Sequence, residues 1–359
     1  MKTIIFAGGG TAGHVEPALS VAQQWKKEHP EDKCIFIGTK NGLETSLVPA
    51  AGFDLRTINK VALARTFSPS VILLPLQLFK AVMQARSIIK GSDLLVGFGG
   101  YVSAASYLAA KSCGVPILIH EANARPGIAN RLGARFTSAL AVSTPVENGV
   151  FNQALITGMP LKRSIIDVIT SPEADWKLVR SKAKRDLGFD DALPLVLVVG
   201  GSQGSQSMNT VIAQSLSALL EKKIQVMHSL GKNNVLPSEQ SGYQPHSYIA
   251  DMASAYLAAD VVISRSGALT CSEFEALGMF ALFIPLPIGN GEQLPNAQHL
   301  ADLGRARVIS QNEFTSAWLL SNIDTLIASS KARSAQVSTA NSTAHEKITA
   351  LMQNVLSSQ

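Results

Sequence analysis

The sequence contains little cysteine and no long hydrophobic run, and both absences narrow the class of protein. Its three cysteines, Cys34, Cys113 and Cys271, are odd in number, far apart and form no CxxC pair. They indicate neither a disulfide framework nor a zinc site, and a reducing cytosol fits best. No stretch approaches the ~18 apolar residues of a membrane span, and the apolar run after Met1 is too short for a signal peptide. We therefore expect a protein that is neither exported nor membrane-spanning.

Acidic residues are scarce in one region. Residues 55–92 contain six basic side chains and no Asp or Glu. Across residues 1–160, 15 Lys and Arg stand against 9 Asp and Glu, whereas residues 161–359 hold 16 and 17. The excess predicts an anionic partner, for which nucleic acid and membrane lipid compete. Few aromatic residues in this segment could stack on bases, so nucleic acid is disfavoured as a partner.

The chain does have size and hydrophobic content. Its 359 residues exceed the ~250–300 at which single cores usually divide, so two domains are expected. Hydrophobic residues make up 46% of the chain and charged residues 16%, which is typical of a globular protein with a large core.

A glycine loop follows the first predicted strand. Lys2–Ala7 is predicted to be a buried strand, and Gly8–Gly13 matches GxGxxG before a helical pattern over Pro17–Lys27. A dinucleotide-binding enzyme would close its second strand with an acidic residue. Here Cys34–Ile37 ends in Gly-Thr-Lys, and the nearby acids precede the strand at its other end. NAD(P) binding is therefore disfavoured.

Two further strands of the first half end in loops whose residues could bind a ligand. Leu94–Val96 runs into the glycine cluster of Gly97–Ser103 and a predicted helix over Ala104–Lys111, and Ile117–Ile119 runs into His120–Asn123. Two glycine loops that present backbone amides suggest a diphosphate. The alternative is that these glycines only permit tight turns between strand and helix.

The pattern then starts again. Leu195–Val199 enters the loop Gly200–Ser205, and further units begin at Ile224–His228, Val261–Ser264 and Ala281–Pro285. We therefore predict an α/β protein with two doubly wound, Rossmann-like domains facing across a cleft, with ligands beyond the carboxyl ends of the strands.

The stretch after Val261–Ser264 is the most informative part of the second half. A turn and a helix start follow the strand, so that free amides face an anion, and Arg265 adds positive charge. Glu273 could accept hydrogen bonds from a ribose diol, which together suggests a nucleotide. The alternative is that Thr270 and Glu273 form only a capping box for a later helix start.

Six motifs in this order carry a resemblance: GGGTAGH, GFGGYVS, HEAN, GGSQGS, SRSGALTCSE and PLPIGNGEQ. Together they closely resemble the MurG family of peripheral membrane glycosyltransferases, from about residue 3 to about residue 310. The resemblance implies a GT-B fold, with residues 1–160 and a C-terminal helix at about 342–359 as the acceptor and membrane domain. Residues 161–341 would form the UDP-GlcNAc domain.

The implied activity is inverting transfer of GlcNAc from UDP-GlcNAc to the 4-hydroxyl of undecaprenyl-diphospho-MurNAc-pentapeptide, which gives lipid II for peptidoglycan. The resemblance implies no cofactor, a peripheral location on the cytoplasmic face of the cell membrane, and partners among the proteins of wall synthesis and cell division.

Donor-binding residues carry over onto the loops at the strand ends. They are Thr11, Ala12, Gly13, Asn123, Lys162, Arg163, Ser202, Ile249, Arg265, Ala268, Leu269, Thr270, Glu273 and Gln293. In this assignment the backbone of Ile249 binds the uracil edge, Glu273 holds the ribose and Gln293 reaches the sugar hydroxyls. The acceptor is expected at Gly99, Gly100 and Tyr101.

The sequence departs from the family pattern at three places. The family often has HEQN where this chain has Ala122, and paired glutamines where it has Glu292 and Gln293. It also has GNPVR where residues 158–162 read GMPLK, so a lysine replaces a guanidinium fork, for which Arg163 would compensate.

The chemistry requires a base for the acceptor hydroxyl and positive charge for the leaving diphosphate. His14 is the first candidate base, and a hydrogen bond to an acceptor phosphate or to its own loop is its alternative role. Glu121 is the second candidate, with turn stabilisation as its alternative. No Asp-x-Asp occurs, so a metal clamp of that type is unsupported.

Other functions compete with this assignment. A UDP-GlcNAc 2-epimerase would have no reason for a basic, apolar N-terminal surface, and an oxidoreductase would need the missing ribose carboxylate. A non-catalytic sugar-nucleotide-binding scaffold at the membrane is the non-enzyme alternative.

A final expectation concerns Val71–Met83. This run has too many apolar residues for the single stripe of a core-facing helix, so some should face outward and dock on a membrane. Basic neighbours, Lys60, Arg65, Lys80, Arg86 and Lys90, would add about 1 kcal/mol each near an anionic leaflet. The alternative is a helix buried on two sides and interrupted at Pro75.

Overall fold

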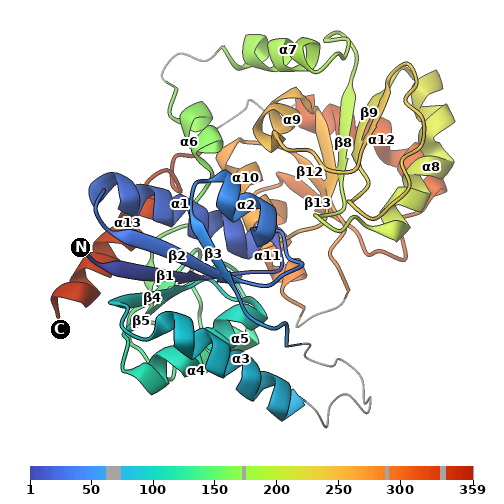
Figure 1. The fold of residues 1–359 in the computed structure, drawn as a ribbon. Coiled ribbons are helices and arrows are strands. Elements are labelled where there is room, and N and C mark those ends of the chain that lie inside the picture. Colours follow the sequence, from blue (N-terminus) through green and yellow to red (C-terminus); the bar gives the residue numbers. More distant parts are fainter. Residues whose placement is uncertain (62–73, 172–174, 288–290, 332–336, 359) are drawn as a thin grey trace. The chain divides into compact units, whose positions relative to one another are not determined.

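The computed structural model describes residues 1–61, 74–171, 175–287, 291–331 and 337–358. The chain divides into two compact units, one of Met1–Arg163 with Ala340–Gln359 and the other of Ser164–Thr339. The division falls three residues after the end of the expected first domain at residue 160. Each unit is a parallel sheet with helices on its two faces (Figure 1).

Unit 1 contains a seven-stranded sheet in the order β3-β2-β1-β4-β5-β6-β7, in which all neighbours are parallel. Its central strands are short, apolar and buried, as expected for a sheet that is covered on both faces, whereas the edge strands β3 and β7 are largely exposed. They are β1 (Thr3–Ala7), β2 (Lys33–Gly38), β3 (Asp54–Thr57), β4 (Leu94–Gly97), β5 (Ile117–Glu121), β6 (Leu140–Val142) and β7 (Leu155–Ile156).

Helices cover both faces of this sheet and bury two separate cores. One core contains Ala81 and Ala85 of α3 with small residues of α4, and the other contains Val15 of α1 with Ile348 and Met352 of α13. The helices of unit 1 are α1 (Ala12–Glu28), α2 (Glu44–Ala50), α3 (Leu74–Ile89), α4 (Gly100–Cys113), α5 (Ile128–Gly133) and α13 (Ala344–Ser357). The end of the chain therefore returns to the first unit.

Unit 2 repeats the same topology with six strands in the order β10-β9-β8-β11-β12-β13. The strands are β8 (Leu195–Val199), β9 (Gln225–Ser229), β10 (Tyr243–His246), β11 (Val261–Ser264), β12 (Ala281–Phe283) and β13 (Ala306–Val308). The helices of this half are α6 (Arg163–Ile169), α7 (Trp176–Asp186), α8 (Gln206–Glu221), α9 (Met252–Ala258), α10 (Ala268–Ala276), α11 (Gln293–Asp302) and α12 (Ser316–Lys331). The predicted pair of Rossmann-like domains is confirmed.

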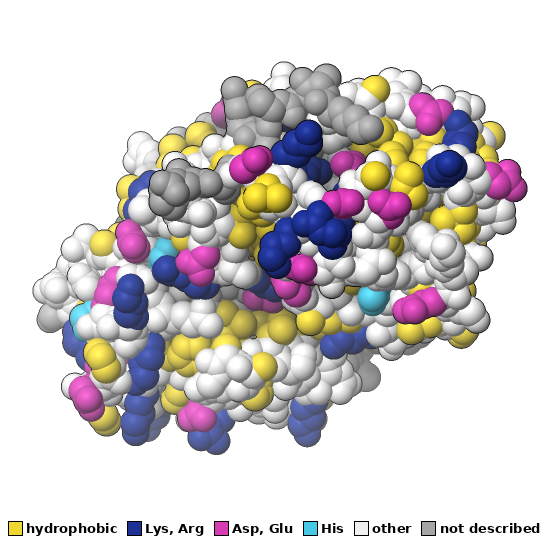
Figure 2. Space-filling view, turned by 90° about the horizontal axis from the view of Figure 1, so that it is seen from above, with side chains coloured by type: hydrophobic (Ala, Val, Ile, Leu, Met, Phe, Trp, Pro, Cys, Tyr) yellow, Lys and Arg dark blue, Asp and Glu magenta, His cyan; other side chains and the backbone are white. Residues whose placement is uncertain are grey.

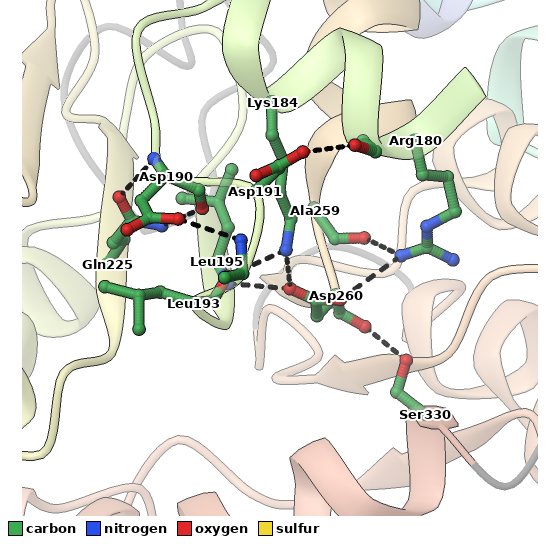
Figure 3. A network of polar contacts seen from close by, with 12 residues as sticks. Arg180, Lys184, Asp190, Asp191, Leu193, Leu195, Gln225, Ala259, Asp260 and Ser330 are labelled. Atoms are coloured by element: carbon green, nitrogen blue, oxygen red, sulfur yellow. Dashed lines mark hydrogen bonds and ion pairs between the residues drawn. The ribbon is translucent and has the colours of Figure 1, made fainter. Parts of the chain in front are cut away.

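The amino ends of β8 and β11 are fastened by a polar network (Figure 3). Asp260, which precedes β11, accepts hydrogen bonds from Lys184 Nζ at 2.6 Å and from the Leu195 amide at 2.8 Å. Lys184 is buried and also donates to the Leu193 carbonyl, and Arg180 lies 3.8 Å from the second Asp260 oxygen. This network joins α7 to the sheet at the edge opposite the glycine loops.

Strand order reverses between β1 and β4 in unit 1 and between β8 and β11 in unit 2. Ligands of doubly wound sheets bind at such switch points, beyond the carboxyl ends of the strands. The sequence places Gly8–Gly13 after β1 and Gly200–Ser205 after β8. These two glycine loops therefore occupy the switch points of the two sheets.

Two helices begin earlier than the sequence pattern predicts. α1 begins at Ala12 rather than Pro17, and α4 begins at Gly100 rather than Ala104. Proline suggested a first helical position, but here it lies in the second turn, where it forgoes one backbone hydrogen bond. The glycines ahead of α4 suggested a loop, yet the helix already includes Gly100. Both helix N-termini consequently reach into the glycine loops.

Candidate active site

The two glycine loops of unit 1 meet at His14. Its Nδ1 lies 3.0 Å from Thr11 Oγ1, and its ring lies against Gly99 and Gly100. A Cβ at Gly99 would be 3.2 Å from His14 Nε2, and Gly99 has a φ of +97°, which favours glycine. The structure thus brings the first candidate base together with the residues expected to bind the acceptor.

The N-terminus of α1 presents unused amides beside His14. Within the described residues, the backbone N–H groups of Ala12 and Gly13 donate no hydrogen bond, and Thr11 is exposed. These amides lie at the positive end of a 17-residue helix. This part of unit 1 can therefore bind an anion.

Tyr101 closes the other side of this loop pair. Its hydroxyl lies close to Gly10, since a Cβ built on Gly10 would be 3.3 Å from the hydroxyl oxygen. The same hydroxyl lies 3.5 Å from Thr39 Oγ1. Lys60 Nζ lies 5.6 Å from the centre of the Tyr101 ring, within the range of a cation–π contact. One basic residue of the segment without acids is thus placed beside the second glycine loop.

The structure does not support Glu121 as the base. The residue is only 2% exposed, and its carboxylate accepts four hydrogen bonds, from the amide and Nδ2 of Asn123, the amide of Gly127 and Nδ2 of Asn130. A buried carboxylate that already accepts four hydrogen bonds within its own turn is not accessible to an acceptor hydroxyl. Its alternative role, stabilisation of the turn, is what the contacts show.

Asn123, expected at the GlcNAc, is half-buried and held by this same turn. Neighbouring His120 is completely buried, with Nε2 3.1 Å from the Gly158 carbonyl. Burial lowers the pKa of His120 to about 4, against a smaller raising effect of that carbonyl. His120 is therefore neutral near pH 7.

In unit 2, α10 begins directly after the turn that follows β11, as the prediction of a nucleotide site requires. Gly267 is the N-cap and Ala268, Leu269 and Thr270 form the first turn, with no hydrogen bond to their amides within the described residues. The capping-box alternative is wrong, because Thr270 lies inside the helix rather than at its N-cap. The amides expected to contact phosphates are available for that role.

Glu273 follows in the second turn of α10. It is 4% exposed, and its Oε2 accepts a hydrogen bond of 3.0 Å from the hydroxyl of Tyr256 in α9. Burial, together with the charge of Glu273, raises the pKa of Tyr256 well above its ordinary value. Tyr256 therefore remains a donor that orients this carboxylate.

Arg265 is held among several loops by its side-chain hydrogen bonds. Its Nη1 donates to the carbonyl of Ile284 at 2.9 Å, and its Nη2 donates to Ser205 Oγ at 2.7 Å and Gln311 Oε1 at 2.6 Å. The residue is 7% exposed, and burial lowers its pKa. Its guanidinium thus joins three loops and does not present an exposed fork to solvent.

The other predicted donor residues lie in unit 2 at three separate loops. Ser202 is half-buried in the loop before α8. The backbone of Ile249, before α9, makes no hydrogen bond within the described part of the chain. Gln293 begins α11, where its Oε1 accepts from the Leu286 amide at 2.9 Å and its carbonyl accepts from Ser266 Oγ at 2.8 Å. Gln293 is therefore fixed next to the start of α10.

Lys162 and Arg163 belong to the first unit by their contacts. Lys162 Nζ forms an ion pair of 2.8 Å with Glu16 of α1. Arg163 is exposed at the start of α6. Lys162 thus has a partner within unit 1, and Arg163 is the more exposed residue of the two.

Sequence reasoning missed Glu44. This residue is completely buried at the start of α2, and its carboxylate binds the amide of Gly10 at 3.0 Å and that of Thr39 at 2.7 Å. An acid was sought at the end of the second strand, whereas Glu44 follows that strand by six residues and turns back to it. The glycines at 38 and 42 on either side of the turn were the available signal.

The exposed side of α3 is apolar. Leu76, Phe79 and Met83 are 52%, 62% and 49% exposed, whereas Ala81 and Ala85 are buried. The alternative of a helix buried on two sides is therefore wrong for α3, and Pro75 lies at its start. Residues 71–73 and Arg65 lie outside the described residues. Nowhere in the described ranges is a helix both long and apolar enough to cross a bilayer.

Comparisons with known proteins agree with this arrangement. The family profile of the glycosyltransferase family 28 N-terminal domain matches residues 4–142, and that of the C-terminal domain matches residues 195–354. The crystal structure of MurG from Acinetobacter baumannii aligns with a TM-score of 0.69 and 27% identity, over 99% of this chain and 100% of that chain. The calicheamicin glycosyltransferase CalG4 shares the fold, with a TM-score of 0.60 and 15% identity. Fold and switch-point loops together define a glycosyltransferase of the GT-B class.

A protein of Streptomyces avermitilis is 42% identical to this chain over 332 residues, which cover 90% of this chain and 89% of that protein. It is named UDP-N-acetylglucosamine--N-acetylmuramyl-(pentapeptide) pyrophosphoryl-undecaprenol N-acetylglucosamine transferase. A protein of Corynebacterium efficiens with the same name is 41% identical over 327 residues. The chain belongs to this MurG family of glycosyltransferases.

Proposed function

We propose that the protein transfers GlcNAc from UDP-GlcNAc to the 4-hydroxyl of undecaprenyl-diphospho-MurNAc-pentapeptide, with inversion and release of UDP. Membership of a family named for this reaction supports the proposal. The observation that carries it is the N-terminus of α10. Three amides without partners in the described chain stand there at the switch point, one turn before a buried carboxylate.

In this proposal unit 2 binds the donor. The amides of Ala268, Leu269 and Thr270 contact the diphosphate, because a helix N-terminus favours an anion. Glu273, oriented by Tyr256, accepts hydrogen bonds from the ribose. The backbone of Ile249 binds the uracil edge, Ser202 contacts the nucleotide and Gln293 reaches the sugar.

Charge near the leaving diphosphate comes from Arg265 without direct contact. The guanidinium is buried and lies among hydroxyl, amide and carbonyl oxygens, so its field is weakly screened. As UDP leaves, negative charge on the diphosphate increases, and helix amides together with this fixed cation stabilise it.

Unit 1 binds the acceptor and supplies the base. The resemblance assigns Ala12 and Gly13 to the donor, but we assign their amides to the acceptor's diphosphate instead, together with the loop of Gly99, Gly100 and Tyr101, because both lie beside His14. His14 accepts the proton of the attacking hydroxyl. Its contact with Thr11 Oγ1 through Nδ1 orients the imidazole beside the second glycine loop.

Release of UDP tests the function. Incubation with UDP-GlcNAc and a short-chain, water-soluble analogue of the lipid acceptor should release UDP and form the disaccharide product. A 2-epimerase would convert UDP-GlcNAc without any acceptor, and a scaffold would bind it without turnover. Either result would contradict the proposed reaction.

We also propose that unit 1 docks on an anionic membrane through α3. Leu76, Phe79 and Met83 follow helical spacing and form one exposed apolar ridge. Lys80 and Lys90 are exposed beside it, and no acidic residue lies between 74 and 92. On the face shown in Figure 2, by contrast, acidic side chains lie among the basic ones. Insertion of apolar side chains together with basic charge is the combination that supports reversible binding.

Vesicle co-sedimentation tests this docking. Leu76→Gln/Phe79→Gln and Lys80→Glu/Lys90→Glu should each reduce binding to vesicles of phosphatidylglycerol and phosphatidylethanolamine. Arg86 is left unchanged, because its Nη1 holds Ser112 of α4. The matched control is Leu155→Thr/Ile156→Thr, an equally exposed pair on β7. Equal sedimentation of all folded variants would exclude α3 as the docking surface.

A further inference from the structure

A buried carboxylate, Glu44, organises the glycine loop that follows β1. Its Oε1 accepts hydrogen bonds from the Thr39 amide at 2.7 Å and from Thr39 Oγ1 at 2.9 Å, and its Oε2 accepts from the Gly10 amide at 3.0 Å. Burial of a carboxylate is costly unless donors satisfy it, and these three donors do so. The side chain therefore joins the ends of β1 and β2 through their backbones.

The surrounding backbone is shaped around this carboxylate. A Cβ at Gly38 would lie 2.3 Å from Glu44 Cγ, and one at Gly42 would lie 2.0 Å from Oε2. Gly9 is also close, since a Cβ there would be 2.9 Å from Oε1. Any side chain at these positions would displace the carboxylate, so the pocket admits Glu44 only because glycines line it.

The contacts of Glu44 extend to the second glycine loop. Thr39 donates its hydroxyl proton to Glu44, so its oxygen can accept from the hydroxyl of Tyr101, 3.5 Å away. Tyr101 in turn lies against Gly10. One carboxylate thus reaches both loops to which the acceptor is assigned, without itself being exposed to substrate.

The engaged Gly10 amide also limits where an anion can bind. Because Gly10 donates to Glu44, its amide is not available to a phosphate, and a carboxylate behind it would repel one. The free amides of Ala12 and Gly13 remain on the helix side of the loop. The carboxylate therefore directs an anion away from the middle of the loop and toward the start of α1, where His14 lies.

We propose that Glu44 is a positioning residue for the acceptor half of the transfer reaction. By binding the Gly10 amide it holds Gly8–Gly13 in the conformation that presents the α1 amides and His14 to the acceptor. This inference rests on the proposed function, because it takes unit 1 as the acceptor-binding unit. It assigns Glu44 no contact with substrate and no role in donor binding.

The test is the kinetics of Glu44→Gln with UDP-GlcNAc and the short-chain acceptor analogue. Glutamine has nearly the same volume as glutamate, but its NH₂ group cannot accept a hydrogen bond. It would face either the Gly10 amide or the donors of Thr39, so the loop must move. A shift of about 1 Å near reacting groups costs up to about 100-fold, so kcat/KM for the acceptor should fall about 10–100-fold. The KM for UDP-GlcNAc and the Kd for UDP should not change. Asp54→Asn, an exposed carboxylate of the same unit, is the matched control and should behave like wild type.

Two outcomes would overturn the proposal. One is an acceptor kcat/KM of folded Glu44→Gln equal to that of wild type. The other is a fall in kcat that equals the fraction of the protein unable to bind UDP, which indicates only a smaller active fraction. Thr39→Val provides a second test that removes one donor and the link to Tyr101, and it should raise the acceptor KM by a smaller factor. An unchanged acceptor KM in Thr39→Val would also contradict the proposal. Wild type that releases no UDP would instead overturn the proposed function.

Discussion

The two units share a strand order but stabilise their first glycine loops with side chains of opposite charge. In unit 1 the carboxylate of Glu44 binds the loop after β1 through the Gly10 amide. In unit 2 the guanidinium of Arg265 binds the loop before α8 through Ser205 Oγ. Both charged groups are buried, and neither forms its contacts through an exposed surface.

This difference indicates what each unit can hold. A buried cation beside the N-termini of α8 and α10 adds to their positive potential, which suits a diphosphate that gains charge as it leaves. A buried anion instead occupies one loop amide and leaves binding to the first turn of α1. Under the proposed function the same topology binds two different ligands, and one charged residue in each unit distinguishes the two loops.

The largest expected effect comes from the base in unit 1. His14→Ala should lower kcat by about 10²–10⁴-fold, because no other group would take the hydroxyl proton. The Kd for UDP should be nearly unchanged, since unit 2 binds it. Steady-state kinetics with both substrates varied measures this. A rise in the acceptor KM alone would show that His14 binds substrate without acting in the chemical step.

Replacement of the cation in unit 2 should be less damaging to catalysis but costly to the fold. Arg265→Gln removes hydrogen bonds to Ile284, Ser205 and Gln311, and we expect a loss of about 2–4 kcal/mol in the free energy of unfolding of this unit. UDP binding should weaken as well, because the positive potential at α10 decreases. Urea titration and calorimetric titration with UDP provide the two measurements. Unchanged UDP affinity in the folded variant would remove Arg265 from the electrostatic account.

Replacement of the ribose ligand should affect only the donor. Glu273→Gln should weaken UDP-GlcNAc binding by about 1–3 kcal/mol, the range for hydrogen bonds to a charged group. Tyr256→Phe is a milder companion, since it leaves the carboxylate in place without its orienting donor. Lower thermal stability with unchanged donor affinity would assign Glu273 to the helix rather than to the ribose.

The smallest expected effect is on the pH dependence of stability, and it should be alike in the two units. Each has a buried histidine, His120 or His228, whose pKa burial lowers to about 4. The unfolded chain takes up these protons near pH 6.5, whereas the folded protein does so only near pH 4, so stability falls as the pH drops through this window. From pH 7.5 to pH 6 the free energy of unfolding should fall by about 1 kcal/mol per histidine.

Urea titrations across this pH range measure the slope. His120→Gln and His228→Gln should each make the dependence shallower by a similar amount. A slope that neither substitution alters would mean that other groups determine the acid sensitivity.

Much of the fold and part of the site could be predicted from the sequence. Strands Leu195–Val199 and Val261–Ser264 have the expected bounds, because continuous apolar runs flanked by turn residues are strong local signals. The position of α10 after Gly267 agrees with the nucleotide interpretation of the same stretch.

The hydrogen-bond partners of long polar side chains could not be predicted from local sequence. Glu121 and Arg265 have the chemistry of a base and a phosphate ligand, but tertiary packing assigns them to a turn and to a junction of loops. Glu44 escaped notice for the same reason, because its partners Gly10 and Thr39 become neighbours only when β1 and β2 pair. Such roles depend on three-dimensional contacts that spacing does not encode.

The most direct test of the division between the units is one kinetic comparison of Glu44→Gln with Glu273→Gln. Both substrates are varied, and each variant is assayed beside wild type. We predict that Glu44→Gln lowers kcat/KM for the acceptor with an unchanged KM for UDP-GlcNAc, and that Glu273→Gln raises the KM for UDP-GlcNAc with an unchanged KM for the acceptor. If both substitutions alter the KM of the same substrate, the assignment of acceptor to unit 1 and donor to unit 2 is wrong.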